Sequence, residues 1–457
     1  MLSADYKTAA LAKLDRRDAR VCIVGLGYVG LPLAIVVAEA GHTVTGIDTN
    51  QSVVDSINAG RSPNPDVKPE QLAQLVAQGR LAASVSFEVA RDADVVVIAV
   101  PTPIDEYRVP VLRHVQAVVD ELSRNVKHGA LVILESTTYP GTTEEVLIPA
   151  FRKQGFMPGQ DLFVGYSPER IDPGNQQWSV ANTPKVVSAL TQDCLDLTMA
   201  FYGGFIEQLV PVSNLRTAEI TKLFENIFRC INIALVNEFQ QICDGFDIDV
   251  WEVIQACSTK PYGFMPFYPG PGLGGHCVPV DPFYLAWKAR EKNLSPEFIE
   301  LAGRVNAAMP TYIADKAASL LNSQRKSMNG ARVALLGVAY KKNTADVRES
   351  PAVKLIELLM GKGAAVSYHD PHVPSISNGS MLESQPLDAG YLNAQDCVIV
   401  TTDHDAIDWS LVLQYESIVL DTRNVLGRLG AWTDAGQPAL LNAGPRTARH
   451  GMPTESN

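Results

Sequence analysis

The 457-residue sequence predicts an α/β protein in which two doubly wound parallel-sheet domains are joined by a middle domain built on a long helix. Short apolar runs recur in both halves of the chain and end in polar or glycine-rich turns, as buried parallel strands do. A glycine-rich turn and an apolar helix follow the first of these runs. A long stretch with helical apolar periodicity separates the two halves.

The first strand, turn and helix have a dinucleotide-binding pattern. The apolar run 20–24 leads into G-L-G-Y-V-G (Gly25, Gly27, Gly30), and an apolar helix follows that ends at Gly41. Glycines at this spacing allow a tight turn and the close approach of a pyrophosphate to the helix N-terminus. The pattern predicts a Rossmann domain; the alternative is a Rossmann repeat without a cofactor.

The next strand closes on Asp48, whose carboxylate can accept hydrogen bonds from a ribose diol. Thr49 and Asn50 follow it and offer no arginine for a 2′-phosphate. We therefore expect NAD rather than NADP as the cofactor.

Three further apolar runs in this half, at 95–100, 131–135 and 162–166, end in the turns P-T-P, S-T-T-Y-P-G-T-T and S-P-E-R-I-D-P-G-N. Ligands of open α/β sheets collect at the carboxyl ends of the strands. The turns would bring five polar residues to that edge: Thr102, Ser136, Thr137, Glu169 and Arg170. Taken singly, the three hydroxyl residues could equally be helix caps.

One long helix is predicted from Leu215 onward. Its apolar residues at 220, 223, 224, 227, 228, 231, 234 and 235 form a wide stripe, so we expect much of the helix to be buried. Lys222 and Asn226 are four residues apart and share a face. Because the stripe leaves few wet positions, this pair is a candidate for lining a site, although such residues usually only face solvent.

The stretch 268–285, Y-P-G-P-G-L-G-G-H-C-V-P-V-D-P-F-Y-L, is the candidate for the chemistry. Four glycines in it allow close backbone approach and positive φ: Gly270, Gly272, Gly274 and Gly275. Asp281 and Pro282 are predicted as the N-cap and first residue of a helix over 283–290. Cys277 would then lie near the positive end of that helix, which favours a thiolate. The alternative is a structural glycine turn with a small buried cysteine.

A second α/β unit starts with the strand 332–338 and includes a strand that ends at Asp370. It lacks the three-glycine turn, so it resembles a Rossmann half without its own dinucleotide. Basic residues at its strand ends could receive a pyrophosphate: Lys341, Lys342, Arg348 and Arg423.

Composition excludes several classes of function. A formal net charge of −12 leaves no basic face for phosphates, so we expect no nucleic-acid partner. The seven cysteines are scattered, with no C-x-x-C pair, which indicates neither a metal site nor a disulfide framework and fits a reducing cytoplasm. The first residues lack the apolar core of a signal peptide, and no run approaches the roughly 18 apolar residues of a membrane span, so we expect no membrane insertion.

Taken together, these motifs resemble those of the nucleotide-sugar 6-dehydrogenases in the UDP-glucose/GDP-mannose dehydrogenase family. The resemblance covers about residues 20–440 and rests, in family order, on G-L-G-Y-V-G, P-T-P, S-T-x-x-P-G-T, S-P-E-R, T-K-L-x-E-N, G-L-G-G-H-C-V-P-V-D, Y-K-K-N-T-x-D-x-R-E-S-P and D-T-R-N. It implies oxidation of a sugar CH2OH to a carboxylate in two NAD-dependent steps, through a thiohemiacetal and a thioester on the cysteine.

The resemblance assigns Cys277 as the nucleophile, Lys222 and Asn226 as groups that stabilise the oxyanion, and Asp281 and Thr137 as holders of the water or proton acceptor. The implied NAD contacts are Gly25, Gly27, Tyr28, Val29, Gly30, Asp48, Thr102, Ser136, Thr137 and Arg348. The implied UDP-sugar contacts are Glu169, Arg170, Lys222, Asn226, Tyr268, Gly272 and Arg423. A thiolate suits the reaction, because an aldehyde can deliver a second hydride only after it becomes a tetrahedral adduct.

The chain departs from the UDP-glucose enzymes, which commonly read S-x-P-E-F-L-x-E-G and C-F-P-K-D. Pro173 and Val280 replace the second glutamate and the lysine. The chain instead resembles the branch that acts on UDP-N-acetylhexosamines for surface polysaccharides. We expect UDP-N-acetylglucosamine, with UDP-N-acetylmannosamine, UDP-N-acetylgalactosamine and UDP-glucose as competitors. The rival classes are an NAD-binding scaffold without turnover and a one-step alcohol dehydrogenase.

The expected organisation is an N-terminal extension (1–18), an NAD-binding Rossmann domain (19–212), a helical middle domain with the cysteine loop (213–325), a C-terminal UDP-sugar-binding Rossmann-like domain (326–443) and a flexible tail (444–457). The middle helix resembles the family's dimer core, which implies an obligate homodimer or a larger homo-oligomer.

Overall fold

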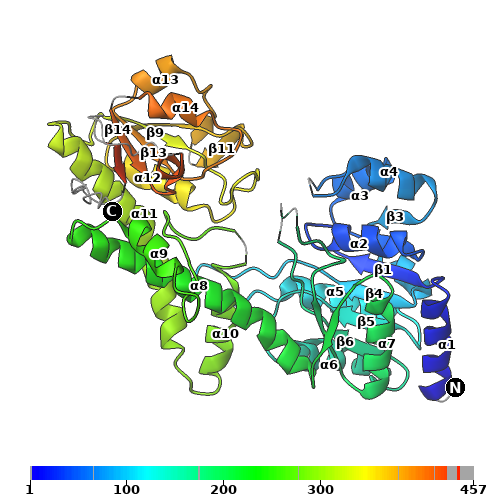
Figure 1. Cartoon of the computed structure of the whole chain (residues 1–457). Coiled ribbons are helices and arrows are strands. Elements are labelled where there is room, and N and C mark those ends of the chain that lie inside the picture. The colour runs from blue at the N-terminus through cyan, green and yellow to red at the C-terminus, as the bar shows by residue number, and fades with distance from the viewer. Residues whose placement is uncertain are drawn as a thin grey trace, which may run out of the picture. The chain divides into compact units, whose positions relative to one another are not determined.

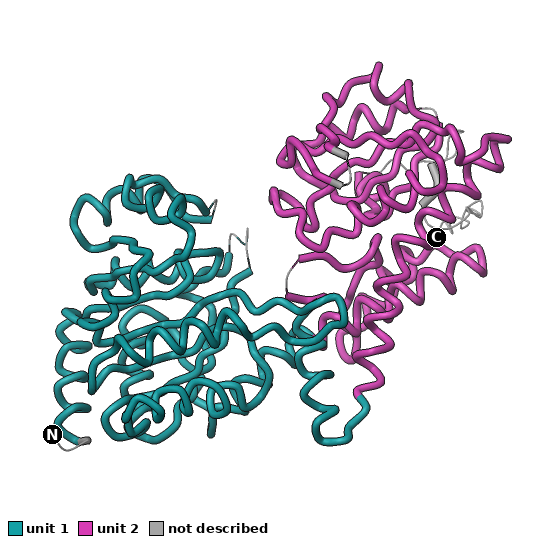
Figure 2. Tube along the Cα trace, turned by 180° about the vertical axis from the view of Figure 1, so that it is seen from behind, with its two compact units in different colours: residues 1–226, 280–295 teal, residues 227–279, 296–457 magenta. Residues whose placement is uncertain are grey.

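The computed structural model describes residues 3–64, 66–172, 175, 177–275, 277–378, 380–415, 417–429 and 440–442. The chain forms two units, Met1–Asn226 with Val280–Ser295 and Ile227–Pro279 with Pro296–Asn457 (Figure 2). Pro173 and the expected tail 444–457 lie outside the described residues. The five segment boundaries expected from the sequence stay a prediction.

Among its described residues, the first unit contains an eight-stranded sheet in the order β3-β2-β1-β4-β5-β6-β7-β8. The strands are β1 (Arg20–Val24), β2 (Thr43–Ile47), β3 (Leu81–Ser84), β4 (Val95–Ile98), β5 (Leu131–Leu134), β6 (Phe163–Tyr166), β7 (Lys185–Ala189) and β8 (Leu209–Pro211). All neighbours pair in parallel except β6 and β7. β4, β5 and β6 are buried at every position, as their uninterrupted apolar runs predict.

Helices cover both faces of this sheet (Figure 1). The helical segments that lie wholly in the unit are α1 (Ser3–Asp15), α2 (Gly30–Glu39), α3 (Gln51–Asn58), α4 (Pro69–Ala77), η1 (Phe87–Asp92), α5 (Arg113–Asn125), η2 (Thr143–Leu147), α6 (Ile148–Lys153), α7 (Gln192–Gly203) and α10 (Asp281–Arg290). Alternate residues of β1 enter different cores: Val21 and Ile23 pack with α2, α3, α4 and α7, whereas Cys22 and Val24 pack with α5 and α6. The predicted doubly wound arrangement is therefore confirmed.

The N-terminal extension is a helix of the first unit. Leu14 of α1 belongs to the same core as α2 and α7. Lys7 Nζ pairs with the carboxylates of Asp193 at 2.7 Å and Asp196 at 2.6 Å, both on α7. These contacts fasten α1 to the domain that follows it.

Helix α8 (Leu215–Gly245) begins in the first unit and ends in the second. The expectation that its apolar stripe is mostly buried is only half right. Leu223, Ile227 and Ala234 are buried, but four other members of the stripe are exposed. These are Ile220, Phe224, Phe228 and Leu235. A stripe this wide spans more of the helix circumference than the rest of the chain covers.

The second unit contains a five-stranded parallel sheet, in the order β10-β9-β13-β14-β15 among the described residues. Its strands are β9 (Arg332–Leu336), β10 (Ala365–His369), β13 (Cys397–Val400), β14 (Ile418–Asp421) and β15 (Leu440–Asn442), with a hairpin of β11 (Ser375–Asn378) and β12 (Ser380–Glu383). Its remaining helices are α9 (Val250–Ser258), α11 (Glu297–Ser323), α12 (Pro351–Gly361), α13 (Ala389–Asn393), α14 (Trp409–Leu413) and α15 (Val425–Arg428). In the described part of the chain, every helix falls short of the length and apolarity needed to cross a membrane.

The predicted cap of α10 is wrong. Val280 occupies the N-cap without a side-chain hydrogen bond, and Asp281 is the first helical residue. The Asp281 carboxylate accepts a hydrogen bond from Asn226 Nδ2 at 2.5 Å instead. The Asp281 side chain therefore binds a residue distant in the sequence, whereas the local pattern predicted that it would cap the helix terminus.

Candidate active site

The glycine turn after β1 fits a dinucleotide. Gly25 has a φ of 95°, and a Cβ there would lie 2.5 Å from the Ala99 carbonyl oxygen. A Cβ at Gly30 would lie 1.8 Å from the Gly25 carbonyl oxygen, so α2 packs directly on the turn. At Gly27 an added Cβ would meet nothing within 4 Å in the described chain. The turn is tight where packing requires it and open where a pyrophosphate would approach α2.

Asp48 lies beside this turn at the end of β2. Its Oδ2 accepts a hydrogen bond from the Leu26 amide at 3.0 Å, and its Oδ1 accepts one from the Asn50 amide at 2.9 Å. Asp48, Tyr28 and Val29 are all half-buried. The predicted NAD contacts of the first half of the fold therefore lie together, and their roles stay a prediction.

The three hydroxyl residues after β4 and β5 are not helix caps. Other residues hold the N-cap positions of α5 and η2. Ser136 is buried, and its Oγ donates to the Val100 carbonyl at 2.8 Å, which ties the ends of the two strands together. Thr102 and Thr137 are half-buried at the same sheet edge.

Four polar side chains from three segments form a buried cluster in the first unit. Lys222 and Asn226 come from α8, Glu169 follows β6, and Asp281 begins α10; they are between 3% and 8% exposed. Lys222 Nζ lies 3.8 Å from Glu169 Oε2, and Asn226 Nδ2 donates to Asp281 Oδ2. The face shared by Lys222 and Asn226 is thus buried rather than solvated, and the role of the pair in a site stays a prediction.

Burial makes both carboxyl groups of this cluster weak acids. Desolvation raises the pKa of Asp281 to about 7, although Lys222 and the Asn226 hydrogen bond lower it. Desolvation also raises the pKa of Glu169, against the opposing charges of Lys222 and Lys185. A carboxyl group that titrates near neutral pH can take up or release a proton during a reaction.

Arg170 follows Glu169 and is held on two sides. Its Nη1 donates to the Pro184 carbonyl at 2.9 Å, and its Nη2 pairs with the Glu225 carboxylate on α8. The guanidinium is therefore fixed close to the buried cluster.

Cys277 lies in the second unit, where its side chain is half-buried. Of the four glycines in the loop before it, Gly272 (φ 132°) and Gly275 (φ 81°) adopt the positive φ that glycine allows. His276 lies outside the described residues. The activation of the thiol as a thiolate stays a prediction.

The other two glycines of the loop lie against residues of the same unit. A Cβ at Gly274 would lie 2.5 Å from Tyr340 Cβ, and a Cβ at Gly270 would lie 2.7 Å from Arg423 Nη1. Arg423 Nε donates to the Thr401 carbonyl at 2.8 Å, and desolvation lowers the pKa of this guanidinium. The predicted sugar-nucleotide residue Arg423 thus lies against the glycine loop.

Two more predicted contacts lie in the second unit. The Arg348 carbonyl accepts a hydrogen bond from the Gly275 amide at 3.0 Å, while its guanidinium pairs with the Asp346 carboxylate at 2.6 Å. Tyr268 is 56% exposed and stacks on Trp251 with ring centroids 5.8 Å apart. The structure thus gathers Glu169, Lys222, Asn226 and Asp281 in one unit and the glycine loop, Arg348 and Arg423 in the other.

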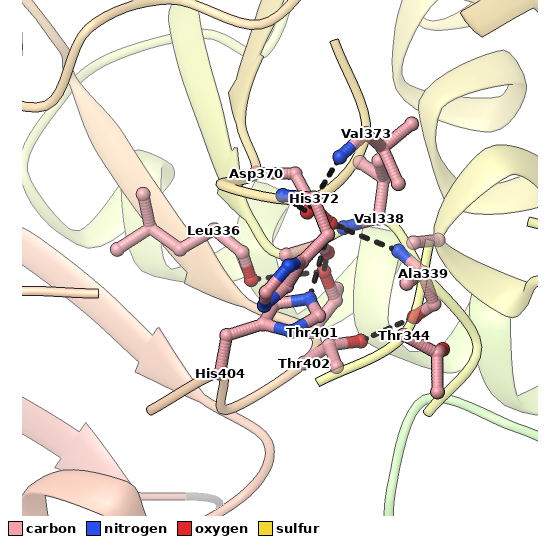
Figure 3. A network of polar contacts seen from close by, with 12 residues as sticks. Leu336, Val338, Ala339, Thr344, Asp370, His372, Val373, Thr401, Thr402 and His404 are labelled. Atoms are coloured by element: carbon pink, nitrogen blue, oxygen red, sulfur yellow. Dashed lines mark hydrogen bonds and ion pairs between the residues drawn. The ribbon is translucent and has the colours of Figure 1, made fainter. Parts of the chain in front are cut away.

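The acidic residue of the second Rossmann-like half makes its hydrogen bonds within the fold. Asp370, at the end of β10, accepts hydrogen bonds from the amides of Val338 at 2.7 Å and Ala339 at 3.1 Å, and its Oδ2 lies 3.1 Å from His404 Nε2 (Figure 3). Burial opposes ionisation, but these hydrogen bonds and His404 lower the pKa of Asp370 to about 2. Unlike half-buried Asp48, Asp370 is 3% exposed, which agrees with a half that lacks its own dinucleotide.

Sequence reasoning missed Glu219, which is fully buried on α8. Its carboxylate accepts hydrogen bonds from the amides of Gly141 and Thr143 and from Thr143 Oγ1 at 2.7 Å. Its spacing of three and seven residues from Lys222 and Asn226 places it on the same helical face. That spacing was the signal available in the sequence. Glu219 ties the turn after β5 to the helix that carries the cluster.

Sequence profiles of the UDP-glucose/GDP-mannose dehydrogenase family match three consecutive stretches. The NAD binding domain matches residues 19–206, the central domain matches residues 216–308 and the UDP binding domain matches residues 334–428.

Relatives match most of the chain and most of their own length. A UDP-N-acetyl-D-glucosamine 6-dehydrogenase of Pseudomonas aeruginosa is 35% identical over 85% of this chain and 91% of its own length. A UDP-N-acetyl-D-mannosamine dehydrogenase of Methanococcus maripaludis is 32% identical over 91% of this chain and 95% of its own. The solved structure of a UDP-D-ManNAc dehydrogenase from Pyrococcus horikoshii superimposes with a TM-score of 0.82 at 29% identity, covering 92% of this chain and 97% of that one.

Proposed function

Because the chain belongs to the UDP-glucose/GDP-mannose dehydrogenase family and is an NAD-dependent nucleotide-sugar 6-dehydrogenase, we propose that it oxidises the C6 hydroxymethyl group of a UDP-N-acetylhexosamine to the carboxylate. UDP-N-acetylglucosamine is the favoured substrate, and the product would supply a surface polysaccharide. The observation that carries the mechanism is the buried cluster of Lys222, Asn226, Glu169 and Asp281.

The turn Gly25–Gly30, Asp48 and the residues after β4 and β5 would hold NAD, which supplies the hydride acceptor for both oxidations. Asp281 takes the proton of the C6 hydroxyl in the first oxidation, since its pKa of about 7 leaves a usable base near neutral pH. Thr137 holds the hydroxyl or the water in place.

Cys277 then adds to the aldehyde carbon through its sulfur. The Lys222 ammonium and the Asn226 amide stabilise the oxygen that gains negative charge in this adduct. After the second oxidation the acyl group is a thioester on Cys277, and water releases the uronate. Burial strengthens the interaction of Lys222 with that oxygen, because little solvent screens a side chain that is 6% exposed.

Two observations support an N-acetylhexosamine. The relatives above act, by their names, on UDP-N-acetyl-D-glucosamine and UDP-N-acetyl-D-mannosamine. In the sequence, Pro173 and Val280 replace two charged residues of the UDP-glucose enzymes, which leaves more room and less polarity for an acetamido group. A site shaped for that group discriminates against a sugar without it, because its polar partners would be left unpaired.

The test is kcat/KM for UDP-N-acetylglucosamine, UDP-N-acetylmannosamine and UDP-glucose with NAD, together with the NADH formed per sugar. We expect two NADH per sugar, no aldehyde trapped by a carbonyl reagent, and the highest kcat/KM for UDP-N-acetylglucosamine. A preference for UDP-N-acetylmannosamine or UDP-glucose would reassign the substrate. One NADH per sugar would reduce the chain to a one-step alcohol dehydrogenase, and no NADH with any sugar would favour a binding scaffold.

A further inference from the structure

A buried ion pair lies next to the cluster and has no place in the mechanism above. Glu135 follows β5 and Lys185 begins β7; Lys185 Nζ lies 2.9 Å from Glu135 Oε1. Tyr202 of α7 donates its hydroxyl proton to the same carboxylate oxygen, and Lys185 Nζ lies 4.8 Å from the centroid of the Tyr202 ring. The side chains of Glu135 and Lys185 are 2% and 11% exposed, so both charges are almost entirely removed from water.

The pair opens onto the same pocket as Glu169. Glu135, Glu169, Arg170 and Lys185 line this pocket in the first unit, together with apolar side chains that include Leu33 of α2. Glu169 Oε2 faces Lys222, whereas Glu169 Oε1 is buried and has no hydrogen-bond partner within the described part of the chain.

The charges that act on Glu169 come from four directions. Lys222 on α8 and Lys185 on β7 favour its ionised form, whereas Glu135 after β5 and Asp281 on α10 oppose it. Arg170, its chain neighbour, turns its guanidinium to Pro184 and Glu225. Burial raises the pKa of Glu169 most, and two ammonium groups and two carboxylates act on it in opposite senses.

A purely structural role explains this pair poorly. Removing two charges from water costs several kcal/mol per ion, and a well-packed apolar pair of similar volume often serves the fold as well or better. A buried pair is informative when another ionisable group lies within reach of its field, because the low local dielectric lets each charge act strongly. Glu169 is such a group.

We propose that Lys185 and Glu135 are positioning residues that set the charge of the Glu169 carboxylate in opposite senses, Lys185 favouring the carboxylate and Glu135 the protonated acid. The inference rests on the proposed function and on the implied role of Glu169 as a UDP-sugar contact that pairs with Lys222. The Tyr202 hydroxyl fixes the Glu135 carboxylate by its hydrogen bond. Lys185 therefore acts both on Glu135 and on the Glu169 carboxylate in the pocket. The pair thereby decides in which pH range Glu169 can pair with Lys222.

The direct test is a pH titration of the Glu169 carboxyl carbon by ¹³C NMR in protein labelled at the glutamate side-chain carboxyls, assigned with Glu169→Gln. Lys185→Met should move the Glu169 titration upward by about one pH unit, and Glu135→Gln should move it downward by a similar amount. The double variant Lys185→Met/Glu135→Gln removes both charges, so it should titrate near wild type and also guards against misfolding of either single variant. Lys185→Arg keeps the charge and should preserve the wild-type titration.

The matched control is Lys127→Met, which removes another lysine of the first unit, one that pairs with Asp94 at 2.6 Å. It should leave the Glu169 titration unmoved. In Lys185→Met and Glu135→Gln, the acidic limb of kcat/KM against pH should shift in the same direction as the Glu169 titration, because the clustered carboxyls titrate as a unit.

Opposite shifts in Lys185→Met and Glu135→Gln would support the proposal, since a loss of packing cannot move one titration in two directions. Shifts in the same direction, or no shift with a lower melting temperature, would make the pair structural and overturn it. The NMR titration needs no turnover, so a failure of the proposed function, read as no NADH from any sugar nucleotide, is distinguishable from a failure of this inference.

Discussion

At the scale of single residues, Asp281 meets two opposing demands. Its carboxylate is buried and accepts a hydrogen bond from Asn226, and it is also the group to which we assign a proton transfer. A base suited to neutral pH requires the raised pKa that burial produces, and burial makes its ionisation costly to the fold. Asp281 should therefore affect stability and activity in different directions.

We predict that Asp281→Asn stabilises the protein above neutral pH while reducing kcat by more than about 100-fold. The folded state holds the Asp281 proton more tightly than the unfolded state, since burial raises its pKa from 3.8 to about 7. Stability therefore falls as the pH rises from 3.8 to about 7, by roughly 4 kcal/mol, and stays at the lower level above that. Asparagine removes this penalty.

The measurement is the melting temperature of both proteins between pH 5 and pH 8. The gain from Asp281→Asn should grow with pH through this window and level off above about 7. Asp92→Asn, at a carboxylate whose side chain is 77% exposed, serves as the control and should show no such trend. A variant that is less stable than wild type by the same amount at every pH would contradict the prediction.

Cys277→Ala should abolish uronate formation and leave the fold intact. The side chain is half-buried, so its removal should cost roughly 1 kcal/mol or less, whereas the second oxidation has no nucleophile without it. Uronate measured by chromatography and the melting temperature check the two parts. Cys257→Ala changes an exposed cysteine of the same unit and should retain full activity; uronate production by Cys277→Ala would remove the thiol from the mechanism.

At the scale of elements, α8 has an apolar face that the rest of the described chain leaves exposed. Its exposed apolar residues are three, four or seven positions apart, as on one side of a helix, and the segment just after it continues the series. They are Ile220, Phe224, Phe228, Leu235, Phe239 and Ile242, with Phe246 just beyond the helix end. An uncovered apolar surface of this kind marks an interaction site, and two copies of one helix face form a symmetric interface.

We predict that the protein is a homodimer through this face and that Leu235→Glu dissociates it. A carboxylate in the centre of an apolar interface would lose hydration without a partner. Light scattering should give the dimer mass for wild type and the monomer mass for the variant. The matched control is Leu294→Glu, at a leucine that is 63% exposed against 64% for Leu235 and lies outside α8. A stable, active wild-type monomer would refute the dimer.

At the scale of the whole molecule, the two Rossmann-like halves share one architecture but differ in the role of the acidic residue after the second strand. Both halves place a carboxylate at the end of the second strand of a parallel sheet, next to the turn after the first. Asp48 is half-buried beside an open glycine turn, whereas Asp370 is enclosed by backbone amides and His404. The turns differ two residues after their first glycine: Gly27 is exposed in the first turn, whereas Ala339 in the second is 1% exposed.

We therefore predict one NAD per chain. Calorimetric titration should give a stoichiometry of one, and Asp48→Ala should weaken NAD binding about tenfold or more by removing the acceptor for the ribose diol. UDP-sugar affinity should change little in that variant, which serves as its internal control. A stoichiometry of two would show that the second half still accepts a dinucleotide.

The sequence alone determined the sheet-forming strands, the glycine turn and the long helix of this protein. These features depend on local pattern: uninterrupted apolar runs for β4, β5 and β6, glycines at fixed spacing after β1, and helical periodicity from Leu215. That Lys222 and Asn226 share a face also followed from the pattern, because the spacing of side chains on a helix is set by its own geometry.

Only the tertiary structure decided which partner each polar group would find. The local pattern made Asp281 a helix cap, but Asn226, 55 residues earlier in the sequence, holds its carboxylate instead. The pairing of Lys185 with Glu135 and of Glu219 with the turn after β5 joins segments 50 and 76 residues apart, and neither carries a local signal of its partner. Periodicity reports which face of an element is apolar, whereas burial and electrostatic environment depend on what the rest of the chain brings against that face.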